Sequence, residues 1–283
     1  MSIPEKVLDG IDRLEPLPIT VQKLLVALQD QSADFNEIAQ TIEFDGAITA
    51  NILRTANSAA FGGRVRIENT RDAVVRLGTI TLLDIMLLGH LRTLKVASPL
   101  YNLSEDDLWL HGATASLAVK AIAKETRNRK IPEAATIAAL IHDIGKLIMV
   151  RYLNTEPSVL GKQHEKRDLT SVEAETELFG CNHAEVGGAV ARKWSFPEPI
   201  TQAIEHHHET LPAEPNLMLD VVVLANLTAK IVAGGSGTAG MNHLADTAGL
   251  IDRVGLTADG CDRVCAETAV WMEELKQNYG LAK

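Results

Sequence analysis

The stretch that decides the fold runs from residue 138 to residue 149 and reads AALIHDIGKLIM. It belongs to an apolar run that ends near Leu153, and Pro132 stands upstream, where a helix can start. We predict a helix over this run, with His142 and Asp143 inside it. Burying an ionised carboxylate in such surroundings is costly unless it is paired or bound to metal. The same stretch therefore predicts a functional site.

Helix signals continue in both directions from this stretch. Aromatic residues make up only 4% of the chain, and alternating β-branched runs are few. Capping patterns, proline entries and glycine stops mark further helices. We expect these over residues 14–29, 34–44, 46–56, 70–78, 79–96, 182–194, 197–208, 217–232 and 258–278, with another capped by Ser104. The expected fold class is all-α, with two packed helical lobes that divide near residues 97–104.

The composition indicates a folded, acidic protein. The 283 residues include 27 Lys and Arg against 37 Asp and Glu, which gives a net charge of −10 with His neutral. A broad acidic surface repels nucleic-acid phosphates and anionic lipids, so we expect neither nucleic acid nor a membrane as a partner. No apolar run approaches the roughly 20 residues of a membrane span. The first residues lack a signal-peptide pattern, and three cysteines do not suggest a disulfide framework. We therefore expect a cytoplasmic protein.

Four further histidines suit a metal site together with the His-Asp doublet. His111 and His183 lie on predicted helices, and His207 and His208 form an adjacent pair at a helix end. Neutral imidazoles and a carboxylate suit Zn, Fe, Mn or Ni, and the mixture does not choose among these ions. Two alternatives stay open: each imidazole can be a core histidine with one hydrogen bond, and Asp143 can be satisfied by a nearby Lys or Arg. The histidines that we assign to ordinary structural roles are His90, His164 and His243.

This order of residues resembles that of the HD-domain metal-dependent phosphohydrolases. In that superfamily a histidine, a His-Asp doublet and a closing aspartate follow one another, and relatives with two metals have further histidines between the doublet and that aspartate. The segment HDIGK at residues 142–146 is typical of the superfamily. Other segments, including an NS-x-x-[FY]-G element at 57–62, narrow the resemblance to the HDOD family, the HD-related output domain. These segments lie at residues 14–25, 35–63, 71–78 and 183–209. The resemblance covers about residues 14–233.

The resemblance implies an N-terminal helical lobe packed on an HD-type helical lobe. It also implies a catalytic role for Asp143 and a contact between Lys146 and a substrate phosphate. The alternative for Lys146, an ion pair with Asp143 three residues earlier, is equally open because such pairs are common on helices. The metal ligands that the resemblance implies are His111, His142, Asp143, His183, His207 and His208.

The sequence departs from the family pattern at two places. The position of the closing aspartate corresponds to Asn226, which offers a carbonyl oxygen but no charge. Asp220 is not an easy substitute, because six positions place it about 240° around the helix. The cyclic-di-GMP phosphodiesterase relatives carry a GYP motif after the histidine pair, whereas this chain reads ETLPAEPN at 209–216. This difference argues against cyclic-di-GMP hydrolysis, though not against nucleotide binding.

The charges of the expected site favour binding over turnover. Asp143 is the only obvious carboxylate, and two divalent ions would bring four positive charges against its single negative charge. One ion held by His111, His142 and Asp143 is therefore the easier arrangement, and two ions are the alternative. The missing anionic ligand should weaken retention of the metal.

These observations lead to one main functional hypothesis and one alternative. We expect a signalling or regulatory HDOD protein that binds a signalling protein on another chain, and a nucleotide or phosphate ligand. The alternative is a metal-dependent phosphohydrolase that acts on a nucleotide or phosphoester. The expected organisation is an extension over 1–13, lobes over 14–98 and 99–233, a linker at 234–240 and a helical extension over 241–283.

Overall fold

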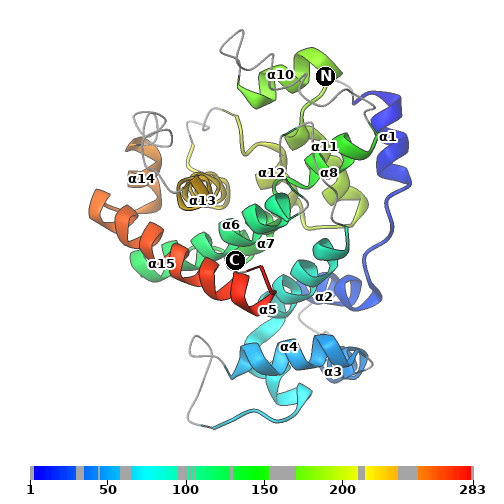
Figure 1. The fold of residues 1–283 in the computed structure, drawn as a ribbon, viewed down its shortest axis with the longest axis vertical. Coiled ribbons are helices and arrows are strands. Elements are labelled where there is room, and N and C mark those ends of the chain that lie inside the picture. The colour runs from blue at the N-terminus through cyan, green and yellow to red at the C-terminus, as the bar shows by residue number, and fades with distance from the viewer. Residues whose placement is uncertain are drawn as a thin grey trace. The chain divides into compact units, whose positions relative to one another are not determined.

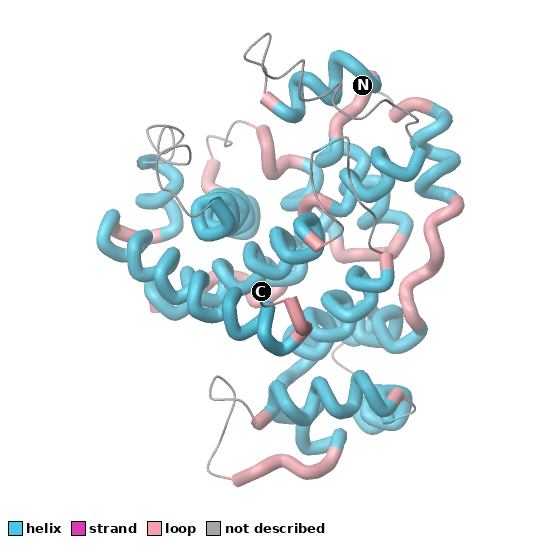
Figure 2. The backbone as a smooth tube through the Cα atoms, in the orientation of Figure 1, coloured by secondary structure: helices cyan, strands magenta, loops and turns pink. Residues whose placement is uncertain are grey.

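A computed structural model describes most of the chain, and every regular element in its described part is a helix (Figures 1 and 2). The all-α prediction is confirmed. The described residues are 3–29, 35–43, 45–57, 65–94, 101, 104, 106–127, 130–152, 170–209, 214–234 and 248–281. The chain divides into two compact units: one comprises residues 15–94, and the larger one comprises residues 1–14 and 95–283.

The 15–94 unit is organised around its longest helix. Its described helices are α2 (Ile19–Gln29), α3 (Phe35–Glu43), α4 (Gly46–Ala56) and α5 (Thr70–Thr93). α5 packs against the other three, and Leu24, Ile42 and Ile52 are among the fully buried side chains. α2 begins at Ile19 instead of the predicted residue 14. The reason is local: Pro16 and Pro18 disfavour helical conformation in the residues before them.

A break within α5 sits where the sequence predicts one. Gly78 has φ 72° and ψ 168°, a conformation that strains any residue with a Cβ. The structure keeps helical geometry on both sides of Gly78, so the two predicted helices form one kinked element.

The larger unit contains the remaining described helices. They are α1 (Glu5–Asp12), α6 (Asp107–Thr126), α7 (Ala135–Ile141), α8 (Ile144–Tyr152), α10 (Ser171–Phe179), α11 (His183–Lys193), α12 (Glu198–Glu205), α13 (Leu217–Gly234), α14 (Ala248–Val254) and α15 (Ala258–Asn278). α6 packs against α7, α13 and α15, and α8 packs against α11 (Figure 1). The core of this unit is thus a set of helices gathered around α6 and α7.

Two glycines in the larger unit allow the backbones of neighbouring helices to approach each other closely. At Gly112 on α6, an added Cβ would overlap the backbone carbonyl of Leu140 on α7. At Gly145 on α8, it would overlap the backbone of His183 at the start of α11. Each glycine lies one or two positions from a residue of the expected site. Close packing of backbones therefore determines where those side chains point.

The His-Asp doublet does not lie inside a helix, so that prediction was wrong. α7 ends at Ile141 and α8 begins at Ile144, which leaves His142 and Asp143 at the junction between them. The backbone N–H of Lys146 bonds to the carbonyl of Asp143, three residues back, as in a tight turn. The junction lets both side chains of the doublet leave the helix surface and meet other elements.

Two further local predictions differ from the structure. Ser104 does not cap α6 through its side chain; instead its backbone N–H donates to Asp107 Oδ2 at 2.6 Å, and the helix begins at Asp107. α10 was not predicted, although Thr170 and Glu173 form a reciprocal capping box at its start. By contrast, the capping box of Asn182 and Glu185 that opens α11 is present as predicted.

The chain ends belong to the larger unit. α1 packs against α8 and α11, and α14 and α15 pack against α13. The expected linker at 234–240 lies outside the described residues except for Gly234, the last residue of α13. By length and apolar composition alone, α5 and α13 could cross a bilayer, but more than half of the apolar window of α13 is buried within the fold, as in the core helix of a soluble protein.

Candidate metal centre

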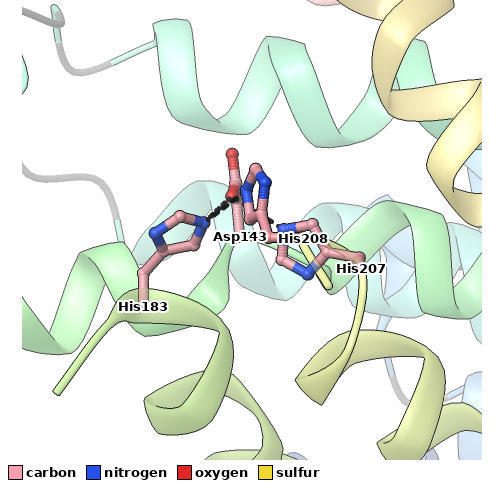
Figure 3. A group of neighbouring side chains, drawn as sticks. All are labelled: Asp143, His183, His207 and His208. Carbon is pink, nitrogen blue, oxygen red and sulfur yellow. Dashed lines mark hydrogen bonds and ion pairs between the residues drawn. The ribbon is translucent and has the colours of Figure 1, made fainter. Parts of the chain in front are cut away.

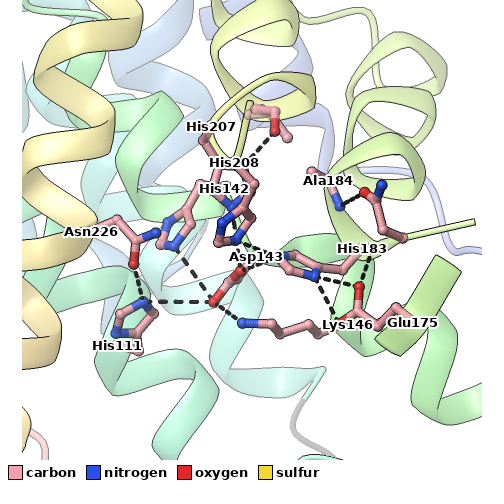
Figure 4. Close-up of polar contacts among 12 residues, drawn as sticks. His111, His142, Asp143, Lys146, Glu175, His183, Ala184, His207, His208 and Asn226 are labelled. Atoms are coloured by element: carbon pink, nitrogen blue, oxygen red, sulfur yellow. Dashed lines mark hydrogen bonds and ion pairs between the residues drawn. The ribbon is translucent and has the colours of Figure 1, made fainter. Parts of the chain in front are cut away.

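Six ligand-type side chains meet in the larger unit, and Asp143 stands at their centre (Figures 3 and 4). They come from α6, from the junction of α7 and α8, from the start of α11 and from the turn after α12. The structure brings together every residue that the sequence singled out as a metal ligand. These are His111, His142, Asp143, His183, His207 and His208.

One oxygen of Asp143 faces the first two histidines of the series. Asp143 Oδ2 lies 3.6 Å from His111 Nε2 and 3.5 Å from His142 Nε2. The same oxygen accepts a hydrogen bond from Lys146 Nζ at 2.6 Å. The ion pair expected as one alternative for Lys146 is therefore present.

The other oxygen of Asp143 faces the later histidines (Figure 3). Asp143 Oδ1 lies 3.1 Å from His183 Nε2 and 3.8 Å from His207 Nε2. His208 Nε2 completes this half, at 3.1 Å from His183 Nε2. A single carboxylate thus joins two groups of imidazoles, one at each of its oxygens.

Backbone carbonyls orient two of the buried rings. His142 Nδ1 donates to the carbonyl of Ala139 at 2.7 Å, and His207 Nδ1 donates to the carbonyl of Ile204 at 2.6 Å. A carbonyl only accepts, so the proton of each neutral ring is on Nδ1 and the lone pair is on Nε2. Both Nε2 atoms are buried, face the cluster and have no hydrogen-bond partner among the described residues.

A buried carboxylate on α10 orients the ring of His183, and the sequence analysis missed it. Glu175 accepts hydrogen bonds from the backbone N–H of His183 at 2.7 Å and from its ring Nδ1 at 2.7 Å (Figure 4). The partner of a ligating histidine is commonly such a carboxylate, which raises the basicity of the ring. The capping box at Thr170 could have revealed the helix, but no local signal shows that Glu175 points inward.

Burial keeps most of these imidazoles neutral. It is the largest cause that lowers the pKa of His111 to about 4, of His142 to about 3 and of His208 to about 2. It also lowers the pKa of His207 well below its usual range. These four rings are therefore uncharged at neutral pH, which is the form that binds metal.

The pKa values of Asp143 and His183 are shifted in the direction that favours their charged forms. Burial raises the pKa of Asp143, but the positive charge of Lys146 and the contacts to His142 and His183 outweigh it and hold that pKa well below its usual range. Burial and Lys146 lower the pKa of His183, but Glu175 and Asp143 outweigh them and raise it. The carboxylates of Glu175 and Asp143 thus favour the protonated form of His183.

The family pattern assigns the position of its closing aspartate to Asn226, and this side chain does lie beside the cluster. Its Oδ1 is 3.1 Å from His111 Nε2, and the side chain is buried (Figure 4). Asp220 faces elsewhere, as predicted, because its Oδ2 pairs with Nε of Arg253 at 3.0 Å. The centre therefore has an amide where a carboxylate would bring a second charge.

The residues present fit a divalent metal ion. Two buried Nε2 lone pairs without hydrogen-bond partners, a shared carboxylate and a buried carboxylate behind His183 are the features of a ligand set with a supporting shell. The set mixes imidazole nitrogens with carboxylate oxygen, which suits the ions expected from the sequence. Lys230, one turn after Asn226 on α13, adds positive charge near Asp143 beside Lys146.

The remaining histidines do not join the cluster. His90 is on α5 in the 15–94 unit, and His164 and His243 lie outside the described residues. His206, the neighbour of the pair, contacts Glu209 at 2.9 Å through Nδ1. The side chain of Asn57, just after α4, hydrogen-bonds to both backbone groups of Ile67 at 2.8 Å.

An all-helical unit that gathers a histidine, a His-Asp doublet and three further histidines around one carboxylate has the features of an HD-type domain. The model of the HDOD domain family matches residues 14–210 of this chain. The chain therefore belongs to the HDOD family.

Three comparisons place the chain among its relatives. A solved HDOD domain protein of unknown function from Geobacter sulfurreducens is 26% identical, with 95% of each chain covered and a TM-score of 0.72. A candidate phosphohydrolase from Shewanella amazonensis SB2B is 21% identical, with 98% of each chain covered and a TM-score of 0.71. An uncharacterized protein of Treponema pallidum (strain Nichols) is 26% identical over 82% of this chain, which spans only 45% of that relative's length.

Proposed function

We propose that this protein is a signalling or regulatory HDOD protein that holds a divalent metal in its HD-type centre and acts mainly by binding a ligand or partner. One observation carries the proposal: six ligand-type side chains are gathered, yet Asn226 stands against His111 where a second carboxylate would complete the set. Such a centre can hold one divalent ion, but it lacks the second negative charge that would favour two ions.

The metal would be Fe, Mn, Zn or Ni, held as one or two ions by the six residues around Asp143. When bound, a divalent ion supplies Lewis acidity, which lowers the pKa of a coordinated water and polarises a phosphoryl oxygen. The residues of this chain supply the rest. His142 and His207 present fixed lone pairs, Glu175 orients His183, and Lys146 neutralises one oxygen of Asp143.

The ligand would be a nucleotide or another phosphate compound. Support comes from the two cations beside the cluster, because Lys146 and Lys230 together favour an anion. The partner would be a signalling protein on another chain, and exposed Ile19 and Val26, seven residues apart on α2, offer it apolar contacts. The net charge of −10 supports a cytoplasmic protein that engages neither nucleic acid nor a membrane.

A metal-dependent phosphohydrolase is the second candidate, and the completeness of the histidine set favours it. In that case Asp143 would help to hold the metal, and Lys146 would contact the substrate phosphate after leaving Asp143. The candidate phosphohydrolase from Shewanella amazonensis shares the fold of this chain. At 21% sequence identity this similarity extends to the fold and not to the activity.

Elemental analysis tests both candidates. The protein is purified without chelator or metal-affinity tag, beside an Asp143→Ala variant. Near-stoichiometric Fe, Mn, Zn or Ni that is lost in the variant supports the metal centre, and a screen of phosphoesters then separates binding from hydrolysis. Metal-free protein that also takes up no added metal contradicts the hydrolase and the metal centre, and it leaves a binding module whose histidines are structural residues.

A further inference from the structure

Among the described residues, the two most exposed of the large apolar side chains both belong to the 15–94 unit. Val65 and Val75 are each 71% exposed. We propose that the surface formed by Val65, Arg66, Arg71 and Val75, called the valine–arginine surface, binds an acidic segment of a partner protein that also carries apolar side chains. This inference rests on the proposed partner-binding function and uses no residue of the metal centre.

Arg76, the residue after Val75 on α5, connects the two valines. Its guanidinium donates to the carbonyl of Val65 at 3.0 Å and to the carbonyl of Ala56, the last residue of α4, at 3.3 Å. The backbone of Val65 therefore lies within the reach of one arginine side chain from α5, near the place where α4 and α5 pack together (Figure 1). The two valines thus belong to one region of the surface.

Asn57 holds the segment that carries Val65 and Arg66 in place. Its amide donates to the carbonyls of Leu53 and Ile67, each at 2.8 Å, and its Oδ1 accepts from the backbone N–H of Ile67 at 2.8 Å. The segment is therefore fixed to the end of α4 by side-chain hydrogen bonds. A surface that is ordered before binding loses less conformational entropy when a partner docks.

The packing of α5 gives no reason for a valine at position 75. Ala73, Val74 and Leu77 are buried, whereas Val75 points away from the core of the unit. A β-branched residue on an exposed helix face loses rotamer freedom without gaining burial. A single exposed apolar side chain is ordinary, but two in one region, with unpaired charges beside them, are the features of a binding surface.

The unpaired charges of this surface are positive, in a chain whose net charge is −10. Residues 54–76 contain five arginines, no lysine and two acidic residues. Arg66 and Arg71 are exposed, and neither guanidinium has an ion pair or hydrogen bond among the described residues. Arg71 precedes Val75 by four positions, so both lie on the same face of α5. Arginine is enriched in protein interfaces, where lysine is depleted.

The chemistry of the valine–arginine surface selects its partner. Guanidinium groups pair with carboxylates through two parallel hydrogen bonds, and burial of the valines requires apolar side chains opposite them. A nucleic acid offers phosphates to the arginines but no aliphatic side chain to the valines, and the overall negative charge of the chain repels it. The observations therefore favour a protein segment that combines Asp or Glu with residues such as Leu.

Fluorescence anisotropy of a labelled synthetic peptide, made of glutamate and leucine in a two-to-one ratio, tests the inference. A second peptide has glutamine in place of each glutamate, and a single-stranded oligonucleotide of matched length is the third probe. We expect the full chain to bind the acidic peptide at least about tenfold more tightly than the other two probes at an ionic strength of about 0.01 M. Binding should weaken at about 0.15 M, because salt screens the arginines.

Matched substitutions locate the binding. Arg71→Gln and Val75→Ser each remove one group of the valine–arginine surface, whereas Arg13→Gln and Val270→Ser change an exposed arginine and an exposed valine of the larger unit. We expect the first two variants to bind the acidic peptide about three- to tenfold more weakly, and the two controls to bind it as the unaltered chain does. Thermal unfolding verifies that all of these exposed-site variants are folded.

Several results would overturn the inference. These are no binding of the acidic peptide at low salt, equal losses in the two controls, or tighter binding of the oligonucleotide, which would assign the surface to nucleic acid. A dimer in light scattering that Val75→Ser dissociates would assign it to a second copy of the chain. Elemental analysis gives its answer independently, so the proposed metal function stands or falls separately from this surface.

Discussion

The carboxylate of Glu175 holds His183 in two ways, through the backbone N–H at 2.7 Å and through the ring Nδ1 at 2.7 Å. The first bond satisfies a free N–H group at the start of α11, and the second determines which nitrogen of the ring points at Asp143. Helix start and ring orientation are therefore coupled. A change in the position of α10 should therefore alter the cluster through the side chain of Glu175.

Restoring the closing carboxylate should strengthen metal binding. Asn226→Asp replaces the amide beside His111 with a charge, which adds an anionic ligand. We expect Co²⁺ to bind more tightly, because the added negative charge attracts the cation, together with increased phosphoester hydrolysis if the chain is a weakened hydrolase. Asn216→Asp, the same chemical change just before α13, is the control. An unaltered affinity for Co²⁺ and no activity in Asn226→Asp would argue against the hydrolase candidate.

Removing the ammonium group of Lys146 should separate its two possible roles. In Lys146→Met the ion pair with Asp143 is lost, so repulsion of a bound cation falls and Co²⁺ should bind as tightly as before or more tightly. Inorganic phosphate should bind the Co²⁺-loaded variant about tenfold more weakly, because a charged hydrogen-bond donor is missing. Calorimetry measures both affinities. If phosphate binds equally well, Lys146 only neutralises Asp143.

The metal-free protein should lose stability as the pH falls from 6.5 towards 4. His111 and His142 have pKa values lowered to about 4 and about 3 by burial, whereas in the unfolded chain they titrate near 6.5. The unfolded state therefore binds more protons below pH 6.5, which favours unfolding, and His111 alone contributes about 3 kcal/mol. The raised pKa of His183 acts in the opposite direction but is one group against several.

Denaturant unfolding at pH 7, 6 and 5 measures this dependence. His111→Asn should flatten the fall in the free energy of unfolding, whereas His206→Asn, at a half-exposed histidine outside the cluster, should not. Parallel curves for all three proteins would show that His111 is not buried in its neutral form.

Gly145 should tolerate no side chain. In Gly145→Ala the new Cβ would overlap the backbone of His183, so α8 and α11 must separate. We expect a loss of about 1–3 kcal/mol in the free energy of unfolding and weaker Co²⁺ binding. Gly89→Ala on α5 is the control, because nothing lies within 4 Å of its added Cβ, and it should be neutral or stabilising by up to about 1 kcal/mol. Equal stability of the two variants would mean that the helices can move apart at no cost.

Much of the helical organisation could be predicted from short segments of the sequence. The bounds of α4 and α15, the break at Gly78 and the capping box at Asn182 follow from short patterns of glycine, apolar spacing and capping side chains. These signals act within one or two turns, so the sequence carries them directly. The junction at His142 and Asp143 was missed because an uninterrupted apolar run predicts a continuous helix, while the break depends on what the two side chains meet elsewhere.

The sequence by itself determined the all-α class, the HDOD resemblance and the six residues that gather around Asp143, since residue types and their order are enough for these. Tertiary structure alone decided the partners. That Asn226 lies against His111 and Glu175 behind His183 depends on contacts between helices. The contact between Asn226 and His111 joins residues 115 positions apart. Such contacts arise from the packing of helices, and no local pattern encodes which side chains they bring together.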